Sequence, residues 1–299
     1  MKKLKLLFVL ILVFTSCNNS IFIDSDWQIV GSGFEFPEGP AWHSNGTLYV
    51  SNCYGNWIAK ITNDKIDTLV FKSDSTFKNT NGLFVANKFI YACDFGLGKI
   101  LKISPKGNVT ELISGYEGEK FNRPNDLIVL NNGNIYFTDP KSYGKEQLDG
   151  RLFFFNSNQN KLQLAQDSLA FPNGLAISPL DKNLYVCESA KSQIVRFEIS
   201  DRGLPVNKQK FIDLPGGDPD GLDFDVVGNL YVAHFGTGTV FVISPNAEII
   251  EKIKTPGLKP SNLEFGDSDL KTLYLTEDET NSVFKIRVRI PGYKLHKNL

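Results

Sequence analysis

The stretch Gly217-Asp218-Pro219-Asp220-Gly221-Leu222 recurs in altered form along the whole chain. In each copy, a residue with a side-chain oxygen stands two positions before an apolar residue, and a tyrosine follows 10 to 13 residues after it. These anchor residues are Glu38, Asn81, Asn125, Asn173, Asp220 and Ser261, at steps of 43, 44, 48, 47 and 41 residues. A period of this length indicates a repeat architecture, so the chain is built from six copies of one unit.

Each unit contains four short runs rich in β-branched and aromatic residues, separated by turn signals such as Asn45-Gly46. No stretch after the N-terminal segment keeps a helical period. Four strands repeated six times predict an all-β fold, a six-bladed β-propeller. The last repeat stops at Pro291-Gly292 without a fourth strand, whereas Trp27–Phe34 supplies a surplus one. We therefore expect this N-terminal strand to close the last blade, within a single domain over residues 27–299.

The N-terminus reads as a targeting segment. Lys2, Lys3 and Lys5 precede an apolar run, and small residues then lead to Cys17. This pattern predicts a lipoprotein signal peptide over residues 1–16, a lipid on Cys17 and a tether over 17–26; an ordinary secretory signal is the alternative. The protein is then an exported bacterial lipoprotein of the cell envelope, attached to a membrane only through this lipid.

Composition narrows the choice of partners. The formal net charge is −1, which gives no electrostatic case for binding nucleic acid. The other three cysteines, Cys53, Cys93 and Cys187, form an odd set in an exported protein and are predicted to be packing residues. We expect a monomer, although no motif fixes the oligomeric state.

The anchor residues should converge at one mouth of the central channel, because each stands where the chain enters the innermost strand of a blade. All six carry side-chain oxygens, and hard oxygen donors from separate loops suit calcium. Magnesium, manganese or zinc are alternatives, although the anchors include no His or Cys of a usual zinc site. Asn-Gly and Asp-Gly pairs are also ordinary turn formers, so the same dipeptides could be purely structural.

Five segments resemble the senescence marker protein/gluconolactonase/luciferin-regenerating-enzyme family: Phe36–Trp42, Arg123–Leu127, Tyr136–Pro140, Phe171–Ala176 and Pro219–Leu222. The resemblance covers nearly the whole chain after the signal. It implies a six-bladed propeller that hydrolyses lactones with calcium or another divalent metal, although some members act on other esters or organophosphates. A sugar lactone is the favoured substrate, and acyl lactones and aryl esters are alternatives.

The resemblance also implies roles for individual residues. Glu38, Asn173 and Asp220 would ligate the metal, with Asn125 as a further ligand or a substrate contact. Arg123 and Tyr143 would contact the substrate. Asp220 would be the general base, but an aspartate bound to a cation has a low pKa, so water acidified by the metal is an alternative.

Other interpretations stay open. The protein could be a non-catalytic propeller that binds a ligand or a protein, because one fold hosts many functions. A strictosidine-synthase-like activity would need an acid that we do not find. His234 is expected to be structural, and the long segment Thr138–Gly150 is either a cover over the site or a surface excursion.

Overall fold

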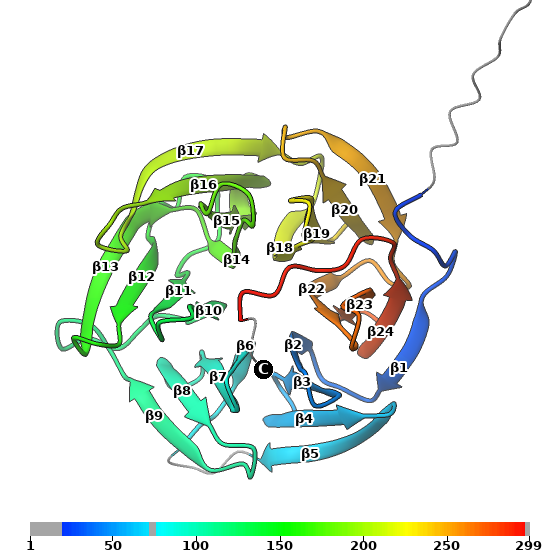
Figure 1. The fold of residues 1–299 in the computed structure, drawn as a ribbon. Helices are drawn as coiled ribbons and strands as arrows, with labels where there is room; N and C mark the ends of the chain where they lie inside the picture. Colours follow the sequence, from blue (N-terminus) through cyan, green and yellow to red (C-terminus); the bar gives the residue numbers. More distant parts are fainter. Residues whose placement is uncertain (1–19, 72–75, 297–299) are drawn as a thin grey trace, which may run out of the picture.

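The structure is a computed structural model that describes residues 20–71 and 76–296. The predicted signal peptide, Cys17 and the first part of the tether lie outside the described residues. The described residues form six four-stranded antiparallel sheets arranged in a ring, which confirms the six-bladed β-propeller (Figure 1).

Each of the first five sheets is made of four consecutive strands. Blade 1 contains β2 (Pro37–His43), β3 (Thr47–Asn52), β4 (Trp57–Thr62) and β5 (Lys65–Phe71). Blade 2 contains β6 (Thr80–Ala86), β7 (Phe89–Asp94), β8 (Lys99–Ile103) and β9 (Val109–Ile113). Blade 3 contains β10 (Leu127–Val129), β11 (Ile135–Asp139), β12 (Gly150–Asn156) and β13 (Lys161–Leu169). Blade 4 contains β14 (Pro172–Ile177), β15 (Leu184–Glu188), β16 (Gln193–Ile199) and β17 (Pro205–Asp213), with a 3-10 turn at Ser189–Lys191. Blade 5 contains β18 (Asp218–Phe224), β19 (Leu230–Phe235), β20 (Thr239–Ile243) and β21 (Ile249–Lys254).

The sixth blade joins the two ends of the chain. It contains β22 (Pro260–Gly266), β23 (Thr272–Glu277) and β24 (Ser282–Arg287), and β1 (Gln28–Ser32) pairs with β24 as the outer strand. The prediction that the N-terminal strand closes the last blade is confirmed. This closure covers the edge of β24, which would otherwise be free to pair with another chain.

The described part of the predicted tether packs against the propeller. Phe22 is 5% exposed, forms a β-bridge with Val288 and belongs to the hydrophobic cluster between blades 5 and 6. The backbone N–H of Ile21 donates to Glu251 at 2.6 Å. The folded domain therefore extends at least to Phe22, five residues before the predicted boundary, because this apolar side chain finds a place between two blades.

Burial follows the position of each strand in its blade. The second strands, such as β3 and β15, are buried along their whole length because neighbouring blades cover both faces. The outer strands β5 and β21 are exposed or alternate. The core is thus a series of six clusters between blades. Within the described residues, no helix is long and apolar enough to cross a membrane.

The C-terminal segment, residues 288–296, leaves β24 and crosses one face of the ring toward the inner strands (Figure 1). His296 is buried, and its Nε2 lies 2.6 Å from the carbonyl oxygen of Val129 in blade 3. Lys294 Nζ donates to the carbonyl oxygen of Trp42 at 3.1 Å. This segment therefore closes one end of the central channel and leaves the other end for ligands.

Candidate active site

The anchor residues stand at irregularities of the innermost strands. The register shifts between Glu38 and Ala41 in β2, between Pro172 and Leu175 in β14, and between Pro219 and Leu222 in β18. Such bulges turn a side chain out of the regular alternation and are common beside active sites. The dipeptides that the sequence also allowed as simple turns thus lie inside strands.

The glycine after each of these anchors is required by close packing at the centre of the ring. A Cβ atom on Gly39 would lie 2.4 Å from the backbone nitrogen of Leu83 in the next blade. A Cβ atom on Gly174 would lie 2.4 Å from the carbonyl oxygen of Asp220. Inner strands from neighbouring blades meet here without room for a side chain, and this contact holds the anchors close together.

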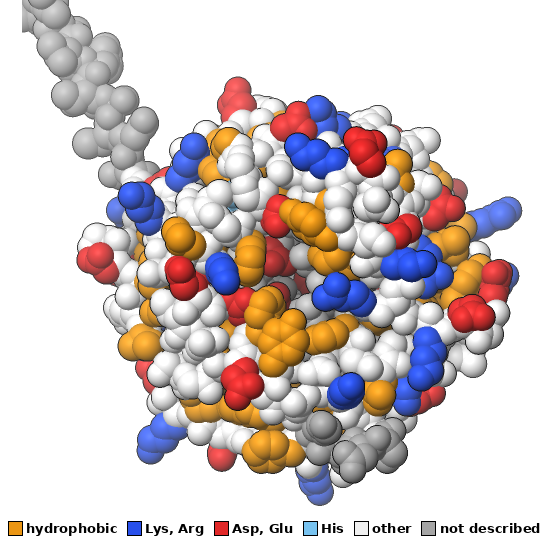
Figure 2. Space-filling model, turned by 180° about the vertical axis from the view of Figure 1, so that it is seen from behind, with side chains coloured by type: hydrophobic (Ala, Val, Ile, Leu, Met, Phe, Trp, Pro, Cys, Tyr) orange, Lys and Arg blue, Asp and Glu red, His pale blue; other side chains and the backbone are white. Residues whose placement is uncertain are grey.

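Five of the six anchors line one pocket. Glu38, Asn81, Asn125, Asn173 and Asp220 surround a cavity of about 210 Å³ together with Arg123 and Tyr143. Every candidate metal ligand and substrate contact predicted from the sequence is therefore in this pocket. Figure 2 shows the corresponding face, hollowed at its centre, with acidic side chains at the bottom of the hollow and hydrophobic side chains around it.

Ser261, the sixth anchor, does not line the pocket. Its hydroxyl donates to the carbonyl oxygen of Pro37 at 2.9 Å, next to Glu38. Similar hydroxyls tie other blades to the following anchor. Ser51 donates to the carbonyl oxygen of Asn81 at 2.6 Å, Thr138 to that of Asn173 at 2.8 Å, and Ser189 to that of Pro219 at 2.6 Å.

Burial and mutual repulsion raise the pKa values of the site carboxyl groups. Desolvation raises the pKa of Glu38 to about 8, and the charge of Asp126 adds to the effect. Desolvation also raises the pKa of Asp220 well above its ordinary value, followed by the charges of Glu38 and Asp278. The pKa of Asp278 is raised to about 8 by desolvation and then by Glu38. Three neighbouring carboxyl groups therefore share a region that contains too little positive charge.

The pocket oxygens fit a hard divalent cation. The Oδ1 atoms of Asn81 and Asp220 are buried and have no hydrogen-bond partner among the described residues. Buried polar atoms are normally paired, and an oxygen aimed into a pocket without a partner fits a ligand atom. Among the described residues, no group of three or more His, Cys, Asp or Glu side chains is arranged to hold a metal. The candidate set instead combines the carboxylates of Glu38 and Asp220 with amide oxygens.

Other residues have structural roles. His234 is fully buried, its Nε2 contacts the carbonyl oxygen of Gly216, and it does not line the pocket, as expected for a structural histidine. The thiols of Cys53, Cys93 and Cys187 are free and buried, and desolvation raises their pKa values well above normal. Cys93 and Cys187 are packing residues, as predicted, whereas the buried Cys53 also lines the pocket.

Several lining residues that were not predicted from the sequence share one position in the repeat. Cys53, Phe95, Ser189 and Phe235 each stand four residues after the tyrosine of their repeat, and all four line the pocket. Asp278 holds the same position in blade 6. The position could have been found from the sequence, because the second strand of each blade ends there beside the anchor strand.

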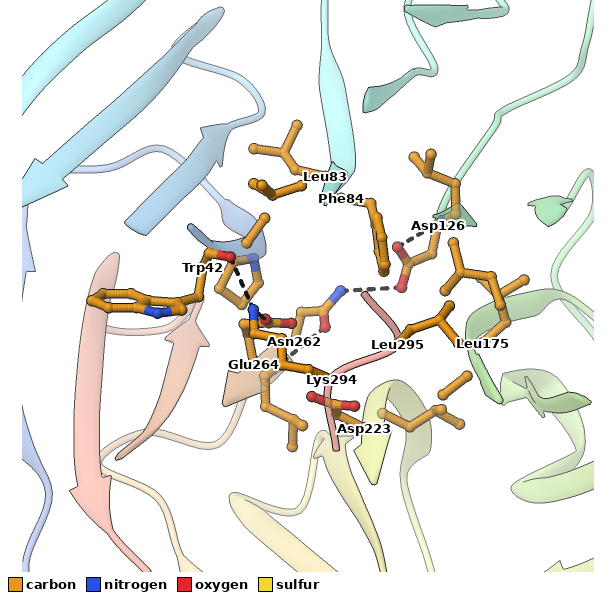
Figure 3. A pocket seen from close by; sticks show the side chains of 18 of the residues that line it. Trp42, Leu83, Phe84, Asp126, Leu175, Asp223, Asn262, Glu264, Lys294 and Leu295 are labelled. Atoms are coloured by element: carbon orange, nitrogen blue, oxygen red, sulfur yellow. Dashed lines mark hydrogen bonds and ion pairs between the residues drawn. The ribbon is translucent and has the colours of Figure 1, made fainter. Parts of the chain in front are cut away.

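A second cavity lies at the other end of the channel, beneath the C-terminal segment (Figure 3). Its acidic and lysine side chains are Asp126, Asp223, Glu264 and Lys294, and Lys294 Nζ lies 3.4 Å from Glu264 Oε1. Asn262 also lines this cavity, and its Nδ2 donates to Asp126 Oδ2 at 3.4 Å. None of the predicted site residues lines this second cavity.

The chain is similar to known proteins over most of its length. Residues 36–278 match the family described as SMP-30/Gluconolactonase/LRE-like region. A gluconolactonase from Zymomonas mobilis is 29% identical over 297 residues, covering 89% of this chain and 82% of the relative. A diisopropyl-fluorophosphatase from Loligo vulgaris is 28% identical over 234 residues, with 73% and 71% covered. The solved structure of a gluconolactonase from Xanthomonas campestris has a TM-score of 0.78 and 27% identity and covers 90% of this chain and 91% of its own. The match over residues 36–278 spans well over half of the sequence, and the chain belongs to the SMP-30/gluconolactonase/LRE-like family.

Proposed function

We propose that this protein is a divalent-metal-dependent lactonase that hydrolyses a small lactone in the pocket around Asp220. The observation that carries the proposal is the set of oxygen donors that five blades bring to one pocket. Two of these donors, Asn81 and Asp220, have a buried Oδ1 atom without a hydrogen-bond partner among the described residues. The gluconolactonases among its relatives support this reaction class. Their names also support a sugar lactone as one candidate substrate.

Glu38, Asn125, Asn173 and Asp220 would hold the cation, and calcium suits this donor set best. When bound, a divalent cation supplies polarisation of the lactone carbonyl and lowers the pKa of a coordinated water molecule. Glu38 and Asp220 contribute the negative charge that such a cation needs. A bound cation would in turn compensate the charge of these buried carboxylates.

The remaining pocket residues act on the substrate. The Arg123 guanidinium is exposed at the mouth and, within the described residues, makes no hydrogen bond or ion pair, so it is available to a substrate oxygen. Tyr143 belongs to the long segment after β11, and its hydroxyl donates to Asp218 at 2.7 Å across the mouth. This segment therefore borders the pocket. We propose that Asp220 accepts the proton of the attacking water, and its buried, unpartnered Oδ1 supports this role.

A lactone panel tests the proposal. The metal-stripped protein should be inactive, and calcium, magnesium, manganese or zinc added separately should restore hydrolysis, with calcium the most effective. Asp220→Asn separates the two roles of Asp220: a variant that binds the metal and keeps its turnover would overturn the assignment as base. No metal-dependent hydrolysis of any lactone or ester would instead favour a non-catalytic binding propeller.

A further inference from the structure

Six aromatic side chains form a collar around the mouth of the candidate active site. They come from five blades and are Phe36, Tyr54, Phe95, Tyr143, Phe171 and Phe235. Their rings contact one another in two arcs. In the first, the ring centre of Phe36 lies 5.3 Å from that of Tyr54 and 6.5 Å from that of Phe235. The ring centres of Tyr54 and Phe95 are 6.2 Å apart. In the second, the ring centres of Tyr143 and Phe171 are 5.4 Å apart.

The collar is maintained at a cost in free energy. Phe36 and Phe171 have φ angles of 67° and 53°, in the left-handed region that bulky residues rarely adopt. Each of them precedes the proline that leads into a candidate ligand, Glu38 or Asn173. Tyr54 and Tyr143 are 53% and 59% exposed. Strained backbone and exposed rings gathered at one pocket are typical of a binding surface.

Two of the hydroxyl groups that line the pocket are already engaged within the protein. The Tyr143 hydroxyl is committed to Asp218, and the Ser189 hydroxyl to the carbonyl oxygen of Pro219. The Arg123 guanidinium lies 5.9 Å from the ring centre of Phe171 and offers one positive group beside the apolar surface. A polyhydroxylated substrate would press hydroxyls against rings and lose hydrogen bonds to water.

The size of the cavity agrees with an aromatic ring. The pocket has about 210 Å³ in all, shared between the oxygen donors at its bottom and the rings at its mouth. An apolar cavity of about 150 Å³ is enough to hold benzene. Aromatic walls also favour an aromatic ligand, because edge-to-face contacts between rings add to the free energy of burial.

We propose that the pocket selects lactones with an apolar, preferably aryl, substituent, and that sugar lactones are poor substrates. The collar holds the substituent, and Arg123 holds the carboxylate of the opened product. This inference rests on the proposed lactonase function for its catalytic consequence, but the selectivity itself can be measured by binding.

Three δ-lactones that differ only in their substituents provide the catalytic test. With calcium-loaded protein, δ-phenyl-δ-valerolactone should have a kcat/KM at least tenfold above that of glucono-δ-lactone. Phe95→Ala and Phe235→Ala should each raise the KM for the phenyl lactone at least fivefold more than the KM for δ-valerolactone. Phe71→Ala, which removes a ring that is 65% exposed on the outer strand β5, is the control and should change neither. Equal or better hydrolysis of glucono-δ-lactone would overturn the inference.

Calorimetric binding of product-like anions separates this inference from the proposed function. 5-Phenylpentanoate should bind calcium-loaded protein at least tenfold more tightly than gluconate, and Phe235→Ala should abolish most of that difference. If no lactone is hydrolysed but this preference is found, the lactonase proposal fails and the collar's selectivity stands. If gluconate binds as tightly as 5-phenylpentanoate, the selectivity is wrong even in an active lactonase.

Discussion

The Thr138 hydroxyl in blade 3 donates a hydrogen bond of 2.8 Å to the carbonyl oxygen of Asn173, a candidate metal ligand in blade 4. Both residues are buried, and the bond crosses from one sheet to the next. Ser51, Ser189 and Ser261 make the same kind of contact to other blades. The ligands thus lie on strands whose backbones are fixed by their neighbours.

Thr138→Val should lower the free energy of unfolding and weaken metal binding. Valine keeps the shape of threonine but leaves the Asn173 carbonyl without this partner, at a cost of about 1–3 kcal/mol. We expect about tenfold weaker calcium binding, measured by calorimetry beside urea denaturation. Thr62→Val is the control, because the Thr62 hydroxyl makes only a long contact of 3.4 Å with the Thr47 hydroxyl and is partly exposed. A Thr138 variant as stable and as tightly bound as the wild type would show that these hydroxyls do not position the ligands.

The repeat revealed the fold and most of the site because both depend on local pattern. The anchor Asp220 and its counterparts recur at a fixed place in each unit, and the closed ring brings five of the six to one pocket. Side chains whose position depends on contacts between blades were not predictable in this way. Asp278 approaches Glu38 only after the last blade closes against the first, and Phe22 finds its place only once blades 5 and 6 exist.

The stability of the metal-free protein should fall as the pH rises from about 5 to 8. The pKa values of Glu38 and Asp278 are raised to about 8, so the folded protein holds protons that the unfolded chain has already released in this range. Raising the pH then favours the unfolded chain. We expect the free energy of unfolding to fall by more than about 1.4 kcal/mol, the equivalent of one pKa unit. Urea denaturation in EDTA at pH 5, 6.5 and 8 measures it.

Saturating calcium should reduce or reverse this slope, because the cation takes the place of the protons. Glu38→Gln should reduce the slope in EDTA, since it removes one of the titrating groups. Metal-free stability that rises between pH 5 and 8 would contradict the assignment of raised pKa values to these carboxyl groups.

Lys294→Met should destabilise the fold by about 1–2 kcal/mol. Lys294 is the cation beside Glu264 in the second cavity and also donates to the Trp42 carbonyl oxygen (Figure 3). The change removes the positive charge that compensates the carboxylates of Glu264 and Asp223. It does not touch the candidate active site. Lys285→Met is the matched control: its partner Asp64 is half exposed, and the expected loss is below about 1 kcal/mol. Equal effects of the two changes in thermal or urea denaturation would refute a role for the C-terminal segment in closing the channel.

Cys17→Ser tests the predicted lipid anchor, which rests on the sequence pattern alone. The wild-type protein expressed in a bacterium should incorporate labelled palmitate and fractionate with membranes, because acyl chains on Cys17 supply the anchoring free energy. The variant should lose the label and leave the membrane fraction with its fold unchanged. An unlabelled wild-type protein cleaved elsewhere would favour an ordinary secretory signal.

The initial rate of δ-valerolactone hydrolysis during a calcium titration of EDTA-treated protein tests the central claim most directly. The wild-type rate should rise from background and saturate with one calcium bound per chain. Glu38→Gln should require about 100-fold more calcium, because a buried charged ligand is lost at a cost of about 3 kcal/mol. Hydrolysis that is unchanged by calcium, or a Glu38→Gln curve that overlays the wild type, would contradict a metal-dependent lactonase at this pocket.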